Sequence, residues 1–226
     1  LFRSGWDRRR FFRTTGAVGA TAVVAGALGR RLEQNRRDDY EAARPTSLPV
    51  VDDPSTPAID ESFHPTEPFV TPVGDFYRID TALSIPYTNV DKWSLSIGGL
   101  VDRPLELTYA DLVARSQTER MVTISCVSNE VGGRYVGNAV WQGVLLADLL
   151  DEVGVQIGAE QVFSRSIDGW TSGFPLEVAR DGRDALVAIG MNGEPLPAEH
   201  GFPARLIVPG LYGYVSATDR KSTRLN

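Results

Sequence analysis

The chain has 226 residues, of which 42% are apolar and 23% are charged, so it is long enough to bury one good hydrophobic core. Its net charge of -6 combines +7 in residues 1–37, where nine Arg face Asp7 and Glu33, with -13 in the remainder, which argues against nucleic-acid binding by the folded part. A single Cys and two His exclude an intrachain disulfide and a zinc site of the Cys-x-x-Cys type.

Residues 1–31 have the features of a targeting segment. The run from Asp7 to Arg13, Asp-Arg-Arg-Arg-Phe-Phe-Arg, precedes a weakly apolar stretch from Thr14 to Leu28. Twin Arg, one further residue and two large apolar residues are typical of a twin-arginine export signal. The stretch of about 15 residues is short for a membrane span. A cleaved signal, a membrane anchor and an Arg-rich tail therefore stay open, the first two implying an extracytoplasmic location. The chain begins with Leu, which leaves a start upstream open as well.

Residues 32–68 are predicted to form an acidic, Pro-rich linker, or an arm that lies on the domain surface. Prolines punctuate this region, as in Asp52-Asp53-Pro54, and apolar residues follow no period. Phe63, Phe69 and Phe76 are too widely spaced for one strand face. We therefore expect these rings to anchor the arm on the domain.

The folded domain is expected to span residues 69–218 as an α+β fold of mixed β-sheets with short helices. Apolar alternation or short apolar runs bounded by Gly, Pro or Asn predict strands at 92–99, 121–124, 161–168, 185–191 and 204–208. Residues 108–113 predict a short helix capped by Thr108. Residues 143–153 predict an amphipathic helix that ends at Gly154. The strands and helices lack the regular spacing of βαβ units.

Cys126 is the strongest single candidate for a functional residue. The strand at 121–124 delivers Ser125 and Cys126 at its end, and the chain then enters the polar, glycine-rich loop 127–133. Functional residues are common on loops held by a rigid scaffold. The alternative is a thiol that serves only as a small buried apolar group.

A second cluster lies in residues 195–210, Pro-Leu-Pro-Ala-Glu-His-Gly-Phe-Pro-Ala-Arg-Leu-Ile-Val-Pro-Gly. His200 and Arg205 pass from a loop into a strand and offer hydrogen-bond donors to an anion such as phosphate. The alternative is a solvated loop whose strand-end Arg pairs with a carboxylate.

With these two clusters, the sequence from about Phe69 to Thr218 resembles the oxidoreductase molybdopterin-binding domain. Sulfite oxidases, plant nitrate reductases and the catalytic subunit of a bacterial methionine-sulfoxide reductase share this domain. The resemblance rests on motifs that are weak singly but specific in this order: Phe76-Tyr77-Arg78, Ser125-Cys126 with Asn129-Glu130, Trp141-Gln142-Gly143-Val144 before Leu149-Leu150, Asp168-Gly169, and the run from His200 to Gly210.

The resemblance implies an exported, molybdopterin-dependent oxidoreductase that transfers an oxygen atom, with two electrons, to or from a small oxo-anion or sulfoxide. It implies that Cys126 is the protein ligand of molybdenum and that Arg78 lies near the oxo-anion site. The implied cofactor-binding residues are Tyr77, Arg78, Cys126, Ser166, His200, Arg205, Ser216, Ala217 and Thr218, with 214–218 as a loop that closes over the cofactor. No haem or flavin module is visible in the sequence, so the electron carrier is expected to be a cytochrome or membrane component.

The resemblance stops at Thr218. Relatives are expected to continue with a Lys-Trp segment and a further strand, whereas residues 219–226 read Asp-Arg-Lys-Ser-Thr-Arg-Leu-Asn. This tail has no apolar period. We therefore predict a foreign tail without a packed role and a domain that lacks its closing strand. The substrate-pocket tyrosine and the dimerisation domain of sulfite oxidases cannot be assigned to this chain.

Two rival functions stay open at this stage. A thiol peroxidase or cysteine hydrolase would use Cys126 as its nucleophile and would need a nearby base, but neither His stands in an obvious dyad pattern. An exported, non-enzymatic binding module would use Cys126 only for packing.

Overall fold

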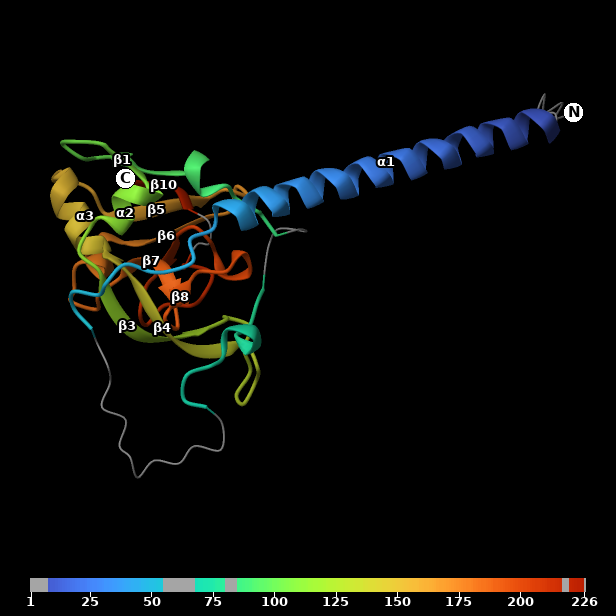
Figure 1. Ribbon diagram of the computed structural model, residues 1–226. Coiled ribbons are helices and arrows are strands. Elements are labelled where there is room, and N and C mark those ends of the chain that lie inside the picture. The colour runs from blue at the N-terminus through green and yellow to red at the C-terminus, as the bar shows by residue number, and fades with distance from the viewer. Residues whose placement is uncertain (1–7, 55–67, 80–84, 217–219, 226) are drawn as a thin grey trace, which may run out of the picture. The chain divides into compact units, whose positions relative to one another are not determined.

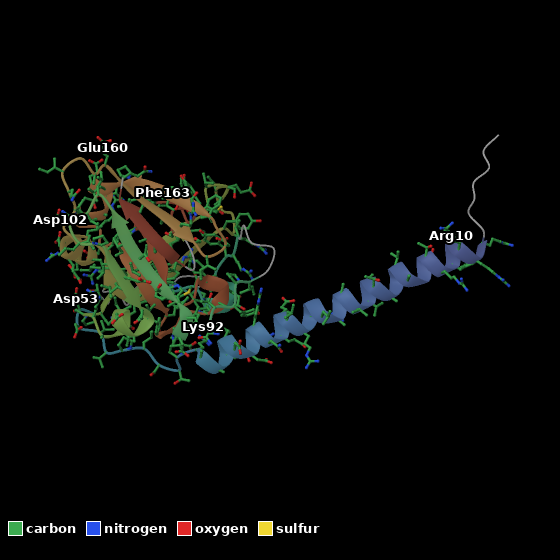
Figure 2. All side chains as sticks on the ribbon, turned by 90° about the horizontal axis from the view of Figure 1, so that it is seen from above. Arg10, Asp53, Lys92, Asp102, Glu160 and Phe163 are labelled. Carbon is green, nitrogen blue, oxygen red and sulfur yellow. The ribbon has the colours of Figure 1, made fainter. Side chains whose placement is uncertain are left out.

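The computed structural model describes residues 8–54, 68–79, 85–216 and 220–225 (Figure 1). The chain forms two units, residues 1–42 and 43–226. In the first unit, α1 (Arg8–Ala43) is a helix of 36 residues, and Arg10 lies near its N-terminal end (Figure 2). By length and composition, α1 is the one helix in the described ranges that could cross a membrane.

The linker predicted from residue 32 begins later than expected, because α1 continues through residues 32–43. This stretch contains neither Gly nor Pro, and it is rich in helix-forming residues such as Leu, Glu, Gln, Arg and Ala. Arg37 Nε also lies 2.8 Å from Glu41 Oε1, an ion pair between successive turns. The polar composition that suggested a linker is equally typical of a solvated helix.

Two β-sheets form the second unit and confirm the predicted α+β class (Figure 1). The first sheet, in the order β3-β4-β7-β8 with β9 beside β7, is antiparallel; it contains β3 (Thr118–Ser125), β4 (Val136–Leu145), β7 (Leu186–Met191), β8 (Glu194–Pro195) and β9 (Arg205–Ile207). The second sheet, in the order β2-β1-β10-β5-β6, contains β2 (Leu105–Thr108), β1 (Ser94–Gly99), β10 (Arg220–Leu225), β5 (Gln161–Ser166) and β6 (Thr171–Pro175).

Short helices connect the strands. The Thr108 cap predicted for α2 (Tyr109–Val113) is confirmed, and the structure adds a capping box in which Thr108 and Asp111 bond each other's backbone. α3 (Leu146–Val153) ends at Gly154 as predicted, with φ of 66°. The 3-10 turns η1 (Val73–Asp75), η2 (Val90–Lys92), η3 (Leu176–Ala179) and η4 (Ala198–His200) complete the described elements.

α3 begins three residues later than the sequence suggested, because residues 143–145 finish β4 instead. Gly143 crosses so close to β7 that a Cβ on it would lie 2.2 Å from Val187 O. Val144 and Leu145 pair with Val187 and Leu186. Apolar spacing alone could not separate the end of a buried strand from the start of an amphipathic helix.

The tail is the clearest correction. Residues 220–225 form β10, which pairs in parallel with β1 and antiparallel with β5, so the expectation that the tail has no packed role is wrong for them. Backbone hydrogen bonds do not depend on side-chain identity, and β1 and β5 each offer an edge to a strand between them. The lack of an apolar period was therefore a poor guide to pairing.

The segment after α1 lies along the first sheet as an arm. Arg44 Nη2 donates to Pro195 O at 2.8 Å, and Leu48 lies against Gly190, where a Cβ would come within 2.5 Å of it. Asp53 forms an isolated bridge with Thr118 at the start of β3. Residues 44–53 of the predicted linker thus lie on the domain surface, as the arm that the sequence also allowed.

A second segment, residues 68–79, crosses the same sheet and carries the first site residues. Thr71 N donates to Asn138 O at 2.8 Å. Phe76 is 4% exposed and packs edge-on against Trp141 at a ring distance of 5.7 Å, so it anchors the segment as expected. Phe69 is 44% exposed, which does not fit that role, and Phe63 lies outside the described residues.

Candidate active site

Cys126 immediately follows β3 and opens a tightly bonded loop. Its backbone N–H donates to Tyr135 O at 2.8 Å, so the two residues extend the β3–β4 ladder by one pair. Asn129 N donates to Cys126 O at 3.0 Å, and Tyr135 N donates to Asn129 Oδ1 at 2.8 Å. The backbone of Cys126 is therefore held at both its N–H and its carbonyl group, and the third hydrogen bond ties Tyr135 to Asn129.

The glycine at position 133 is required by this loop. A Cβ there would lie 2.5 Å from Asn129 Oδ1 and 2.8 Å from Glu130 O, closer than real Cβ contacts allow. Gly133 N also donates to Glu130 O at 2.8 Å. The Asn-Glu and Gly-Gly pairs of the sequence thus build the turn that presents a partly exposed Cys126.

The segment 211–216 joins the Cys126 loop to the second sheet. Gly213 N donates to Ser125 O at 2.8 Å, directly before the thiol residue. On the other side, Trp170 Nε1 donates to Tyr214 O at 3.3 Å. Ser172, on β6, donates from its hydroxyl to Val215 O at 3.3 Å. The end of β3 and the start of β6 are therefore brought to one place, beside the β5–β6 turn that carries Trp170.

Tyr77 lies at this junction, half-buried. Its hydroxyl has no hydrogen-bond partner in the described part of the chain, and a Cβ on Gly213 would lie 2.3 Å from it. Burial raises the pKa of Tyr77, Arg205 opposes this shift and Cys126 adds to it. The phenol therefore lies close enough to Arg205 and Cys126 for their charges to change its pKa.

Ser166 and Ser216 also carry buried hydroxyl groups without a partner among the residues that the structure describes. Ser166, at the end of β5, is 2% exposed, and Ser216 is 1% exposed. Leaving a hydroxyl buried and unbonded costs about 1–3 kcal/mol. By contrast, Ser164, two residues before Ser166, bonds Ser172 O at 3.2 Å. Both hydroxyl groups are therefore available to bond a ligand at this junction.

His200 and Arg205 lie on the side of the first sheet, and both have partners within the chain. His200 is 5% exposed and its Nε2 lies 2.9 Å from Val73 O. Arg205 is 7% exposed, lies over the Trp141 ring at 5.3 Å, and donates from Nη1 to His200 O at 3.3 Å. The alternative of an exposed loop is wrong for both residues.

Burial lowers the pKa of His200, while its hydrogen bond to Val73 raises it and Arg205 lowers it further. The imidazole is therefore neutral at pH 7. A neutral ring that donates from Nε2 to Val73 O can only accept at Nδ1. An anion near this cluster would then be met chiefly by Arg205.

Arg78 is exposed, and its charge contributes to the lowered pKa of His200, which places it near the same cluster. Ala217 and Thr218 lie outside the described residues. The structure thus brings together Cys126, Tyr77, Ser216 and the end of β5, with Arg205 near Tyr77.

The side chains available as metal ligands limit the kind of metal site that this part of the chain can form. No group of three or more His, Cys, Asp or Glu in the described ranges could hold a metal ion. Within these ranges, a metal at Cys126 must therefore bring most of its ligands with it. Side-chain contacts also argue against Cys126 as a catalytic nucleophile, which would need a nearby base. His200 Nε2 contacts Val73 O, whereas the Cys126 sulfur contacts Ser128 Oγ at 3.1 Å.

Gly213, Ser128 and Trp170 were not identified from the sequence. Gly213 could have been suspected because it stands between Tyr212 and Tyr214, where only a residue without a side chain allows close approach. Ser128 carried only a weak signal, its position two residues after the thiol. Nothing local marked Trp170, since its role depends on the distant Tyr214 backbone.

Comparisons with known proteins show which domain family the chain resembles. The model of the oxidoreductase molybdopterin-binding domain matches residues 82–220. Over 131 residues the chain is 39% identical to the uncharacterized oxidoreductase YuiH of Bacillus subtilis. This match covers 58% of this chain and 64% of that protein. Over 175 residues it is 30% identical to the sulfite oxidase of Arabidopsis thaliana, covering 64% and 44%.

Among solved structures, the sulfane dehydrogenase SoxCD from Paracoccus pantotrophus is similar, with a TM-score of 0.65 and 28% identity over 70% of this chain and 44% of that one. This similarity confirms the predicted sulfite-oxidase-type fold. The chain spans less than two thirds of the length of each of these relatives. Tyr77 and Arg78 precede the region that the family model matches.

Proposed function

The chain belongs to the family of the oxidoreductase molybdopterin-binding domain, and from this premise we propose that it transfers an oxygen atom to or from a small oxo-anion or sulfoxide. The domain binds the molybdenum–molybdopterin cofactor and is an oxidoreductase domain. One observation carries the proposal: Cys126 and the unbonded hydroxyl groups of Tyr77, Ser166 and Ser216 gather around one segment, residues 211–216.

The residues present fit such a cofactor. A thiolate is a soft ligand that suits a metal already coordinated by sulfur. The three hydroxyl groups can bond the polar edge of a pterin, which would remove their burial cost. Arg205 and Arg78 supply positive charge for phosphate and oxo-anion groups in a part of the chain that is otherwise acidic.

When bound, the cofactor supplies the two-electron redox chemistry. The chain contributes orientation and charge. Cys126 presents its sulfur from a backbone held by Tyr135 and Asn129. Tyr77, Ser166 and Ser216 would donate hydrogen bonds to the cofactor.

We assign different roles to the two arginines of the site, Arg205 and Arg78. Arg205, buried over Trp141, would neutralise the phosphate end of the cofactor, while His200 accepts a hydrogen bond from it through its backbone carbonyl. Arg78 is exposed and would attract the anionic substrate. This division predicts that Arg78 variants change substrate affinity more than cofactor content.

The test uses protein matured in a host that makes the cofactor. Molybdenum and pterin are measured in the purified chain, and turnover is assayed with sulfite and a ferricyanide acceptor, and with a sulfoxide and a reduced viologen donor. The proposal predicts molybdenum bound to the chain and turnover in one of the two assays. A properly matured chain without molybdenum would contradict it and would favour a thiol enzyme or a binding module.

We also propose export. A twin-arginine signal carries folded proteins, and the cofactor is inserted in the cytoplasm, so the two features fit each other. The apolar stretch of α1 begins directly after the arginines, and its candidate span is 0% buried within the protein. The electron carrier is then a separate protein, a cytochrome or a membrane component.

Replacing Arg8 and Arg9 together by Lys tests the export proposal. The double variant is expected to accumulate in the cytoplasm with unchanged molybdenum content, measured by cell fractionation and metal analysis. A matched control replaces Arg30 and Arg31 by Lys and is expected to be exported. Unchanged export of the Arg8 and Arg9 variant would show that these residues are only a basic flank.

A further inference from the structure

Ser128 stands two residues after Cys126 in the turn from Cys126 to Asn129. Its hydroxyl oxygen lies 3.1 Å from the Cys126 sulfur. The turn is closed by Asn129 N, which donates to Cys126 O at 3.0 Å. Serine and thiol are thus held on the same side of one short turn.

The direction of this hydrogen bond follows from the state of the sulfur. A free thiol and a hydroxyl can each act as the donor. A sulfur that ligates a metal is a thiolate and has no proton to give, so the serine O–H must donate. The contact then becomes a charge-assisted hydrogen bond, which is stronger than the neutral one.

We propose that Ser128 is a positioning residue that tunes the metal by donating a hydrogen bond to the Cys126 thiolate. The inference rests on the proposed function, because it requires Cys126 to be the ligand. Hydrogen bonds to ligating sulfur withdraw charge from it and raise the reduction potential of the metal, as they do in copper and iron–sulfur sites. Ser128 therefore favours the reduced metal.

The loop fixes this contact before any cofactor arrives. Asn129 Oδ1 accepts from Tyr135 N at 2.8 Å, and Gly133 approaches the same oxygen where no Cβ fits. The turn that carries Ser128 is thereby braced against the start of β4. A prepositioned donor of this kind does not need to reorganise when the thiolate forms.

The experiment compares cofactor-loaded variants at position 128 by two readouts other than activity. Ser128→Ala is expected to lower the midpoint potential of molybdenum and to shift the sulfur-to-metal charge-transfer band to longer wavelength. Ser128→Thr keeps the hydroxyl and is expected to match the wild type. Ser128→Val has nearly the shape of threonine without the hydroxyl and is expected to match Ser128→Ala.

Val127→Ala controls for a general change in the turn, since Val127 is 61% exposed in the same turn, and it is expected to leave both readouts unchanged. An unchanged potential and band in both Ser128→Ala and Ser128→Val, with molybdenum bound, would overturn the inference. Loss of molybdenum from these two variants, with Ser128→Thr still containing it, would also overturn the inference. The hydroxyl group would then be needed for cofactor insertion and not for tuning the metal. Absence of molybdenum from the wild type would instead refute the proposed function itself.

Discussion

The two sides of the site differ in how far the chain itself satisfies their polar groups. On the side of the first sheet, His200 bonds Val73 O and Arg205 lies over Trp141. On the side of the second sheet, the hydroxyl groups of Ser166 and Ser216 are buried and unbonded in the described part of the chain. The difference indicates that the chain itself holds His200 and Arg205 in place on the first side, whereas a ligand would complete the hydrogen bonding of the two serines on the second.

The largest effect is expected from Cys126→Ser. Cys126 follows directly after β3 of the first sheet, and its backbone bonds to Tyr135 and Asn129 do not involve the sulfur. The variant should fold normally, yet lose about 100-fold or more in oxygen-atom transfer, since removing even a residue behind a metal ligand costs ~10–100-fold. Steady-state turnover and circular dichroism check this. Near-native turnover with molybdenum bound would show that Cys126 is not the ligand.

His200→Ala tests whether the first side is structural. The change removes the donor to Val73 O and the ring that packs edge-on against Phe76 at 5.5 Å. We expect the free energy of unfolding to fall by about 2–3 kcal/mol with or without cofactor. Urea denaturation measures it, with Glu199→Ala, expected within about 0.5 kcal/mol of the wild type, as the control. A loss seen only in the loaded protein would place His200 on the ligand-completed side.

A matched serine pair on β5 tests the second side. Ser164→Ala removes a satisfied hydrogen bond and should destabilise the cofactor-free domain by about 1 kcal/mol. Ser166→Ala removes an unbonded hydroxyl, so it should leave that domain as stable as before or slightly more stable, but weaken cofactor retention by about 10-fold. Thermal unfolding and pterin release give the two readouts. Equal behaviour of both variants would contradict the comparison.

The smallest effect concerns pH. Burial lowers the pKa of His200 from its ordinary value of 6.5, so the folded state binds the proton less readily than the unfolded state. The stability contributed by neutral His200 is therefore complete above pH 6.5 and declines as the pH falls toward the folded pKa. Between about pH 7.5 and 5, the wild type should lose more stability than His200→Gln, which cannot titrate in this range. Parallel losses would show that the pKa of His200 is not lowered.

The sequence predicted the local features well. The end of β3 at Ser125 and Cys126, the Thr108 cap and the stop at Gly154 follow from short patterns of residues, and the structure confirms each. It could not predict which distant segments meet. Ser166 and Ser216 join Cys126 only through Gly213 and Trp170, whose contacts lie far apart in the chain.

The errors have related physical causes. Residues 32–43 read as a linker because a solvated helix and a linker share the same polar composition. Residues 220–225 read as unpacked because strand pairing there depends on the edges of β1 and β5, not on the side chains of the strand itself. In both cases the structure depends on contact with solvent or on backbone hydrogen bonds, which a pattern of side chains does not indicate.

The central claim is that Cys126 ligates molybdenum in a site completed by the cofactor. The most direct measurement is molybdenum X-ray absorption on the matured wild type and on Cys126→Ser. We predict about one molybdenum per chain in the wild type and the loss of a single sulfur neighbour from the metal in the variant. An identical sulfur coordination in the two proteins, or a matured wild type without molybdenum, would contradict the claim.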